Sequence, residues 1–310
     1  MTFDHCSMPE NQVKATSATP AGGPAERVPP HAYFAVSAIF HYLGPAFAVL
    51  LFVRVDALGV AWLRIASAAI IFAVWRRPWR TWRDLDRPTR RLLVGWGSVL
   101  ALMNCCFYLA IDRLPLGTVA AIEFVPVIAL AALAARTPRN AAALVLAVGG
   151  VALLTDVRIV TEPVGVALAV ANAALFTIYI VLAHRVAQSD RVTGIDGLAL
   201  SMLIAAAVAM PIGAWDAAPA FADPVALAAA LGVGVSSSVI PYVCDQLAMA
   251  RLRRATYALM VSLLPATATI IGIVVLAQIP AAAEVLGIAL VIAGVAVHHE
   301  REVINLPSAG

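Results

Sequence analysis

The sequence has few charged residues, and this scarcity argues against an ordinary soluble domain. Only 13% of the 310 residues are Asp, Glu, Lys or Arg, whereas 62% are hydrophobic. Soluble domains carry about 25% charged residues, so this chain lacks the polar surface to cover itself in water. The formal net charge of +3 is small, and it predicts no nucleic-acid partner.

Motifs for nucleotide, metal and covalent chemistry are also missing. The four cysteines, Cys6, Cys105, Cys106 and Cys244, show no disulfide or metal spacing, and we expect them to act as small apolar packing residues. The chain contains no G-x-x-x-x-G-K-[ST], no H-E-x-x-H and no G-x-S-x-G. We therefore expect no ATP motor, no metal and no cofactor within this chain, and no enzymatic activity.

Long apolar runs dominate what is present. Runs of about 20 residues match one helix across a hydrocarbon core of about 30 Å. Lipid supplies no water for backbone groups, so such runs must be helical. The predicted fold class is an all-α integral membrane protein with ten transmembrane helices, at residues 32–53, 57–75, 92–111, 115–135, 140–155, 164–183, 197–215, 225–247, 256–277 and 281–298.

The loops between these segments predict the orientation. Residues 1–30 are polar and rich in proline, so we expect a disordered cytoplasmic tail rather than a signal or transit peptide. Residues 300–310 are expected to form a second cytoplasmic tail. With both termini inside, the outer loops hold only Arg54, Arg113 and Arg158, and the remaining loop arginines face the cytoplasm, as the positive-inside rule requires. These are Arg76, Arg77, Arg80, Arg83, Arg87, Arg90, Arg91, Arg136, Arg139, Arg185, Arg191, Arg251, Arg253 and Arg254.

Two halves of the chain resemble each other. Residues 106–122, CFYLAIDRLPLGTVAAI, match residues 244–260, CDQLAMARLRRATYALM, at seven of 17 positions. A second match joins residues 146–153 to residues 290–297. These offsets place a first five-helix unit, residues 31–157, on a second unit, residues 162–299. Because five is odd, the second unit crosses the membrane in the opposite sense, and such an inverted repeat is typical of secondary transporters.

The sequence also resembles a known family. The stretch Met103-Asn104, Phe107-Tyr108-Leu109, Leu114-Pro115-Leu116-Gly117, Ala121 and Glu123-Phe124 is similar to the pattern of the drug/metabolite transporter superfamily, EamA type, and within it of the inner-membrane threonine/homoserine exporters. Trp62-Leu63-Arg64 and Pro241-Tyr242 with Asp245 fit the same pattern. The resemblance implies an EamA-like fold for each unit and amino-acid export across the bacterial inner membrane.

Three positions depart from that pattern. The family has Gly-Pro where this chain has Pro126-Val127, Glu where it has Leu264, and Gly-Glu where it has Ala277-Gln278. The transporter class tolerates these changes. The loss of two acidic positions, at Leu264 and Gln278, bears on which substrate is carried.

Three charged residues lie inside the expected spans, where a charge is costly and usually functional. Glu123 lies near the bilayer midplane, where desolvation disfavours its charged form, and is either a proton-coupling and ammonium-binding group or a neutral packing acid. Arg64 either binds a substrate carboxylate or pairs structurally with an acid, and we favour the pairing. Asp245 lies near the cytoplasmic end of its span, within reach of Arg251 or Arg254.

Polar side chains at depth complete the candidate substrate site: His41, Asn104, Tyr108 and Tyr242, with Asn172, Tyr179 and Ser262 also in the apolar spans. Such groups can equally act as hydrogen-bonded contacts between helices. The expected site residues are therefore Glu123, Asn104, Tyr108, Tyr242, Asp245, Arg64 and His41, and Glu123 is the expected proton carrier.

Together these features favour a secondary transporter that exports small amino acids or related metabolites by alternating access, coupled to protons. Efflux of drugs or of another metabolite is the alternative, followed by a membrane-embedded enzyme, and then by a channel or scaffold. The expected partners are a small-molecule substrate and membrane lipids. The sequence leaves open whether the protein is a monomer or a homodimer.

Overall fold

The computed structural model describes residues 29–134, 137–159, 162–187, 191–192, 194–249 and 264–297, and within these ranges it is entirely helical apart from connecting turns. The helices are α1 (Pro30–Leu51), α2 (Ala57–Arg76), α3 (Trp79–Asp84), α4 (Arg87–Ile111), α5 (Leu116–Ala134), α6 (Pro138–Ile159), α7 (Pro163–Ala187), α8 (Gly194–Gly213), α9 (Ala218–Ala222), α10 (Pro224–Gly234), α11 (Ile240–Met249), α13 (Leu264–Leu276) and α14 (Ala282–Val297), with a π-helical turn, η2 (Val235–Val239), between α10 and α11. The expected tails lie almost entirely outside the described residues.

Six of the described helical segments are long and apolar enough to cross a membrane: His31–Leu51, Ala57–Arg76, Arg87–Ile111, Pro163–Ala183, Gly194–Gly213 and Pro224–Cys244. Four more are apolar but shorter as described: Leu116–Pro126, Pro138–Leu153, Leu264–Leu276 and Ala282–Gly294. Large apolar side chains such as Ile70, Val74 and Ile270 are exposed on these helices, as contact with lipid requires. The prediction of an all-helical, multi-pass membrane protein is confirmed.

Some predicted segment boundaries differ from those of the structure. Helix α4, expected to begin at residue 92, begins at Arg87. Pro88 occupies its first turn, and the Asp86 carboxylate accepts the backbone N–H of Thr89 at 3.2 Å. The segment expected at residues 140–155 lies within the 22-residue helix α6, whose apolar part, Pro138–Leu153, is short. The segment expected at 225–247 is interrupted by the π-helical turn. Of the segment expected at 256–277, only the part from Leu264 lies within the described residues.

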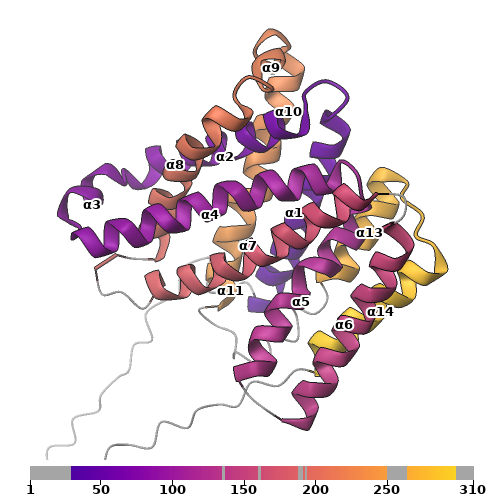
Figure 1. Ribbon diagram of the computed structural model, residues 1–310. Coiled ribbons are helices and arrows are strands. Elements are labelled where there is room, and N and C mark those ends of the chain that lie inside the picture. The colour runs from indigo at the N-terminus through magenta and orange to yellow at the C-terminus, as the bar shows by residue number, and fades with distance from the viewer. Residues whose placement is uncertain are drawn as a thin grey trace, which may run out of the picture.

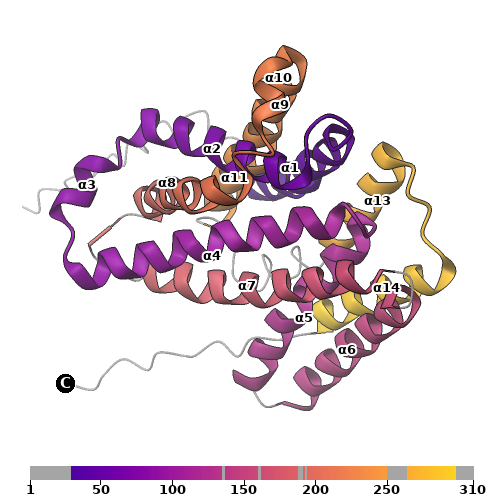
Figure 2. The same ribbon diagram turned by 45° about the horizontal axis from the view of Figure 1, so that its top comes forward.

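The helix contacts follow a paired pattern. When α1, α2, α4, α5 and α6 are matched in order with α7, α8, α10–α11, α13 and α14, three helices contact their own counterparts: α2 with α8, α5 with α13, and α6 with α14. Three further pairs of contacts are equivalent under this matching: α1–α11 corresponds to α4–α7, α1–α13 to α5–α7, and α2–α10 to α4–α8. Figures 1 and 2 both show α4 beside α7 and α6 beside α14.

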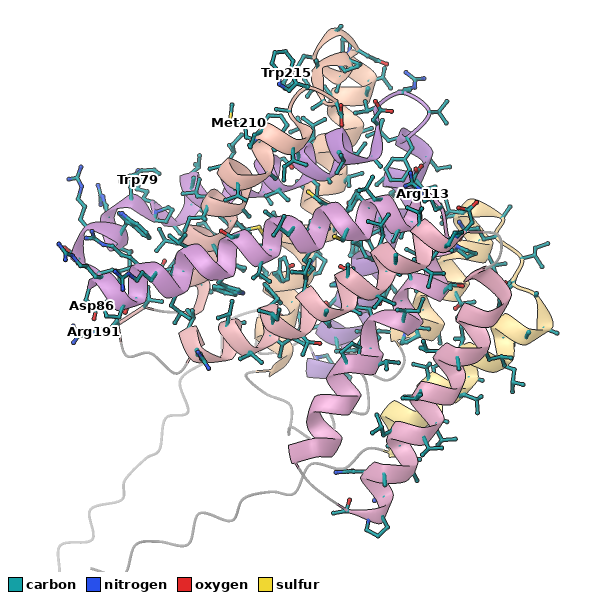
Figure 3. All side chains as sticks on the ribbon, in the orientation of Figure 1. Trp79, Asp86, Arg113, Arg191, Met210 and Trp215 are labelled. Carbon is teal, nitrogen blue, oxygen red and sulfur yellow. The ribbon has the colours of Figure 1, made fainter. Side chains whose placement is uncertain are left out.

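Charged side chains gather at the two ends of the long helix α4. Asp86 and Arg191 lie together just before its first turn, and Arg113 lies just after its last turn (Figure 3). Near the Asp86 end, Arg76 on α2 donates to Asp196 on α8 at 2.8 Å. In the loops before α2 and α10, Arg54 donates to Asp223 at 2.7 Å. The interior between the ends is largely apolar, so the few polar groups buried there stand out.

Candidate functional site

The first polar group in the interior is the Arg64 guanidinium on α2, which is 7% exposed. Its Nε donates to Ser238 Oγ at 3.0 Å, and its Nη2 donates to the carbonyl oxygen of Ser237 at 2.9 Å. Its Nη1 donates to Asn104 Oδ1 on α4. We call Arg64, Asn104, Tyr108, Ser237 and Ser238 the guanidinium cluster.

Neighbouring bonds hold this cluster in place. Asn104 Nδ2 donates to the Leu100 carbonyl at 2.8 Å, which turns the amide oxygen of Asn104 towards Arg64. The buried Tyr108 ring lies 5.5 Å from the centre of the guanidinium, within the range of a cation–π contact. Ser67 Oγ donates to the Arg64 carbonyl at 2.9 Å. Arg64 is therefore fixed from α2, α4 and the π-helical turn at once.

The π-helical turn has a clear origin in the sequence. In a regular α-helix the Ser237 carbonyl would accept the backbone N–H of residue 241, but that residue is Pro241 and has no N–H. The backbone N–H of Ile240 instead bonds the Val235 carbonyl, five residues earlier. The proline thus leaves the Ser237 carbonyl available to Arg64, as π-helical turns at functional sites often do.

Close packing brings α1 and α2 against this turn. Gly44 on α1 lies against Ser237, and a Cβ at Gly44 would come within 2.9 Å of the Ser237 backbone. Gly234 lies against Ser67 and the Arg64 carbonyl, where a Cβ would come within 2.9 Å of that carbonyl oxygen. Only glycine permits approaches this close, so these two positions set the distance between Arg64 and the serines.

The second polar group is the Glu123 carboxyl on α5, which is 6% exposed. Asn172 on α7 donates to its Oε1 from Nδ2 at 3.1 Å. The Tyr42 hydroxyl on α1 lies within electrostatic range of Glu123, and so does the Arg64 guanidinium. We call Glu123, Asn172 and Tyr42 the carboxyl cluster.

Two atoms of the carboxyl cluster lack partners. The Tyr42 hydroxyl and Asn172 Oδ1 are fully buried and have no hydrogen-bond partner among the described residues. A buried polar atom without a partner costs free energy. The Tyr108 hydroxyl of the guanidinium cluster is likewise buried without a described partner, so both clusters keep hydrogen-bonding capacity for a further polar group.

Of the remaining predicted residues, one lies on α1 near the two clusters and two lie on α11. His41 is half-buried next to Tyr42, with 5.3 Å between the ring centroids, and lies within electrostatic range of Arg64. Tyr242 is half-buried on α11 and packs against the apolar cluster that contains Trp96. Asp245 lies on α11, but its side chain, like Arg251 and Arg254, lies outside the described residues.

The structure therefore brings Arg64, Asn104 and Tyr108 together, and it places Glu123 and His41 near them. It differs from the favoured expectation that Arg64 pairs with an acid. Among the described residues the ion pairs are Arg54–Asp223, Arg76–Asp196 and Arg113–Asp112, all close to helix ends, and the direct acceptors of Arg64 are neutral.

Sequence reasoning missed Tyr42, Ser237 and Ser238, and it named Asn172 only as a polar residue at depth. A usable signal existed for the serines. The run Ser236–Ser238 ends three residues before Pro241, so a proline-freed carbonyl falls inside a run of hydroxyl side chains.

Known proteins resemble this chain closely enough to place it. The family described as EamA-like transporters matches residues 163–298. The threonine/homoserine exporter RhtA of Escherichia coli K12 is 33% identical over 254 residues, which cover 81% of this chain and 84% of the exporter. The RhtA protein of Salmonella typhimurium LT2 is 32% identical over 253 residues, with the same coverage. The chain belongs to the EamA-like transporter family. It is a transporter homologue and not an enzyme.

A solved crystal structure supports the fold of this EamA-like chain independently. It shares 17% sequence identity and a TM-score of 0.54, covering 86% of this chain and 97% of its own. At that identity the likeness concerns the fold alone. The roles of the guanidinium cluster and the carboxyl cluster have to be inferred from this chain's own residues.

Proposed function

We propose that this EamA-like protein is a secondary transporter that exports small amino acids, such as threonine or homoserine, or related metabolites across the bacterial inner membrane. The relatives named as threonine/homoserine exporters support this substrate class. The observation that carries it is a pair of ionisable groups of opposite sign, the Arg64 guanidinium and the Glu123 carboxyl, buried in one apolar interior. An amino acid is a zwitterion, so it needs a cationic group for its carboxylate and an anionic group for its ammonium.

The transport route requires two halves that can move relative to each other. We propose ten spans arranged as two inverted five-helix units, residues 31–157 and 162–299, with both termini in the cytoplasm. The paired helix contacts support this arrangement. The family match begins at the first residue of α7 and covers the second unit alone. One contact of the guanidinium cluster, Arg64–Ser238, and one of the carboxyl cluster, Glu123–Asn172, join residues of different proposed units.

In this arrangement Glu123, the proposed proton-coupling group, would lie at the interface between the two proposed units. When the site faces the cytoplasm, the substrate ammonium would replace the proton on Glu123. When the site faces outward, the substrate would leave and a proton would return. Proton and ammonium thus compete for one carboxyl group, which couples export to the proton gradient. Asp245 is the next candidate for this role.

Counterflow in proteoliposomes tests the substrate class. The purified protein, loaded inside with unlabelled threonine or homoserine, should accumulate the same radiolabelled amino acid, and empty vesicles should not. Movement of cationic drugs without any amino acid would overturn the proposal in favour of drug efflux. The changed positions Leu264 and Gln278 would then be the first residues to restore to Glu.

A reporter fusion tests the topology. Alkaline phosphatase, which is active only outside the cytoplasm, is fused after Gly310. We expect no activity, because an even number of spans returns the chain to the side where it began. Strong activity would mean that the C-terminus lies outside the cytoplasm and would contradict the proposed topology.

A further inference from the structure

The contacts of Arg64 fill one particular edge of its guanidinium. The Nε–H and one Nη2–H point in the same direction, and this edge binds the two oxygens of a carboxylate in a bidentate pair. Here the edge is filled by two neutral oxygens of the π-helical turn, Ser238 Oγ at 3.0 Å and the Ser237 carbonyl at 2.9 Å. Their placement imitates a carboxylate group.

Neutral oxygens satisfy the donors but do not neutralise the charge. A buried cation without a counter-charge in direct contact is unfavourable, and a carboxylate would add charge neutralisation and a bidentate geometry to the charge-assisted bonds that Arg64 already donates. A carboxylate that reached this edge would therefore compete well with the two serine oxygens. The third partner, Asn104, binds Nη1 and could remain in place.

We propose that the Ser237 carbonyl and the Ser238 hydroxyl occupy the carboxylate-binding edge of Arg64 in the substrate-free protein, and that the substrate's carboxylate replaces them. This inference rests on the proposed function and deepens it, because it names the group recognised and the element that competes with the substrate. The π-helical turn is the element that moves, since Pro241 keeps the Ser237 carbonyl out of the regular helical pattern.

The exchange has a consequence for transport. Arg64 lies on α2 and the serines lie on η2, so their bonds tie the first proposed unit to the second. A substrate carboxylate breaks this tie, whereas an amine without a carboxylate leaves it intact. The inference therefore predicts selection for the carboxylate itself, beyond selection for size or for the ammonium group.

Equilibrium binding to the purified full-length protein tests the exchange, with L-threonine and L-threoninamide as probes, because the amide keeps the ammonium and loses the carboxylate. Ser238→Ala removes one competing oxygen, so threonine should bind about three- to tenfold more tightly while threoninamide is unchanged, given that one hydrogen bond contributes on the order of 1 kcal/mol. Arg64→Lys keeps the charge but loses the planar fork, so threonine binding should weaken about tenfold or more.

Ser236→Ala is the matched control. Ser236 is the adjacent serine of the same turn, and its hydroxyl donates to the Val233 carbonyl at 3.2 Å. Threonine affinity in this variant should stay within about twofold of wild type. If Ser238→Ala fails to fold, Ser238→Cys, which has nearly the same size and a weaker acceptor, should change affinity in the same direction.

The outcomes separate this inference from the proposed function. Equal binding of threonine and threoninamide to the wild type, or unchanged threonine affinity in a folded Ser238 variant, overturns the inference and leaves amino-acid export standing. A wild-type protein that binds neither threonine, homoserine nor their amides contradicts the proposed function and the inference together. Tighter threonine binding in Ser238→Ala but not in Ser236→Ala supports both.

Discussion

The Arg64 guanidinium and the Glu123 carboxyl lie in the same apolar interior but differ in how many hydrogen bonds they make. Arg64 donates to three acceptors and lies against the Tyr108 ring. Glu123 accepts one hydrogen bond among the described contacts, from Asn172, while the Tyr42 hydroxyl beside it has no described partner. The Arg64 guanidinium is therefore held in one geometry, although the Tyr108 hydroxyl of its cluster has no described partner. The Glu123 carboxyl keeps acceptor capacity that a proton or an ammonium group can use.

Binding of threonine and of threoninamide can distinguish changes at the two clusters. A change at the guanidinium cluster should affect threonine and spare threoninamide, because only threonine carries a carboxylate. A change at the carboxyl cluster should affect both probes, because both carry the ammonium. The ratio of the two affinities therefore reports which side has been disturbed.

The largest effect is expected for Gly234→Ala. The added methyl group would meet Ser67 and the Arg64 carbonyl, and forced packing of this kind costs about 1–3 kcal/mol. We expect a lower melting temperature and threonine binding weakened about ten- to a hundredfold, because the Arg64 backbone would be displaced, with threoninamide less affected. Gly232→Ala on the same helix is the control, since a Cβ there meets no atom within 4 Å. Equal melting temperatures and threonine affinities in the two variants would contradict the importance of the close contact between Gly234 and the Arg64 carbonyl.

A smaller effect that tests the other side is expected for Asn172→Ala. Glu123 would lose the amide that donates to it at 3.1 Å, and a hydrogen bond to a charged group contributes about 1.5–3 kcal/mol. Binding of threonine and of threoninamide should weaken together, by about tenfold. Asn104→Ala provides the comparison, because its loss should weaken threonine alone. A matching change in selectivity for both variants would show that the two clusters are not separable.

Ala277→Gly should alter stability and leave both clusters unchanged. Ala277 has a φ of +53° at the end of α13, in the left-handed region that costs a non-glycine residue roughly 1–2 kcal/mol. The glycine variant should raise the free energy of unfolding by about 1 kcal/mol, because glycine's own entropic cost offsets part of the relief. Denaturant unfolding in detergent measures it. A destabilised variant, or one with an altered affinity ratio, would contradict this assignment.

The smallest effect concerns pH at the loops. The Arg54 guanidinium, and then the backbone N–H groups at the start of α10, lower the pKa of Asp223. The folded pKa lies below the unfolded one, so this stabilisation is complete above the unfolded pKa of about 4 and is lost as pH falls through the folded pKa. The melting temperature should therefore fall less in Asp223→Asn than in wild type between pH 7 and about pH 3. Parallel pH curves for the two proteins would contradict this role.

Much of the fold followed from the sequence, because apolar length alone requires helices in lipid. The boundaries failed where local chemistry decides, as at Asp86 and Pro88, which begin α4 earlier than the apolar run does. Arg64, Asn104 and Glu123 could be named because polar groups in apolar helices are rare. Their partners could not, since the contact of Arg64 with Ser237 depends on a π-helical turn and on close packing at Gly44 and Gly234.

The central claim is that a proton and the substrate ammonium compete for Glu123. Proton release on substrate binding tests it most directly. Threonine is added to the purified protein in weakly buffered solution near neutral pH, and a pH-sensitive dye records the protons released. We predict release from the wild type and from Glu284→Gln, which changes a second buried carboxyl that caps its own helix through Ala281. We predict none from a folded Glu123→Gln protein. Undiminished release from Glu123→Gln would contradict the account.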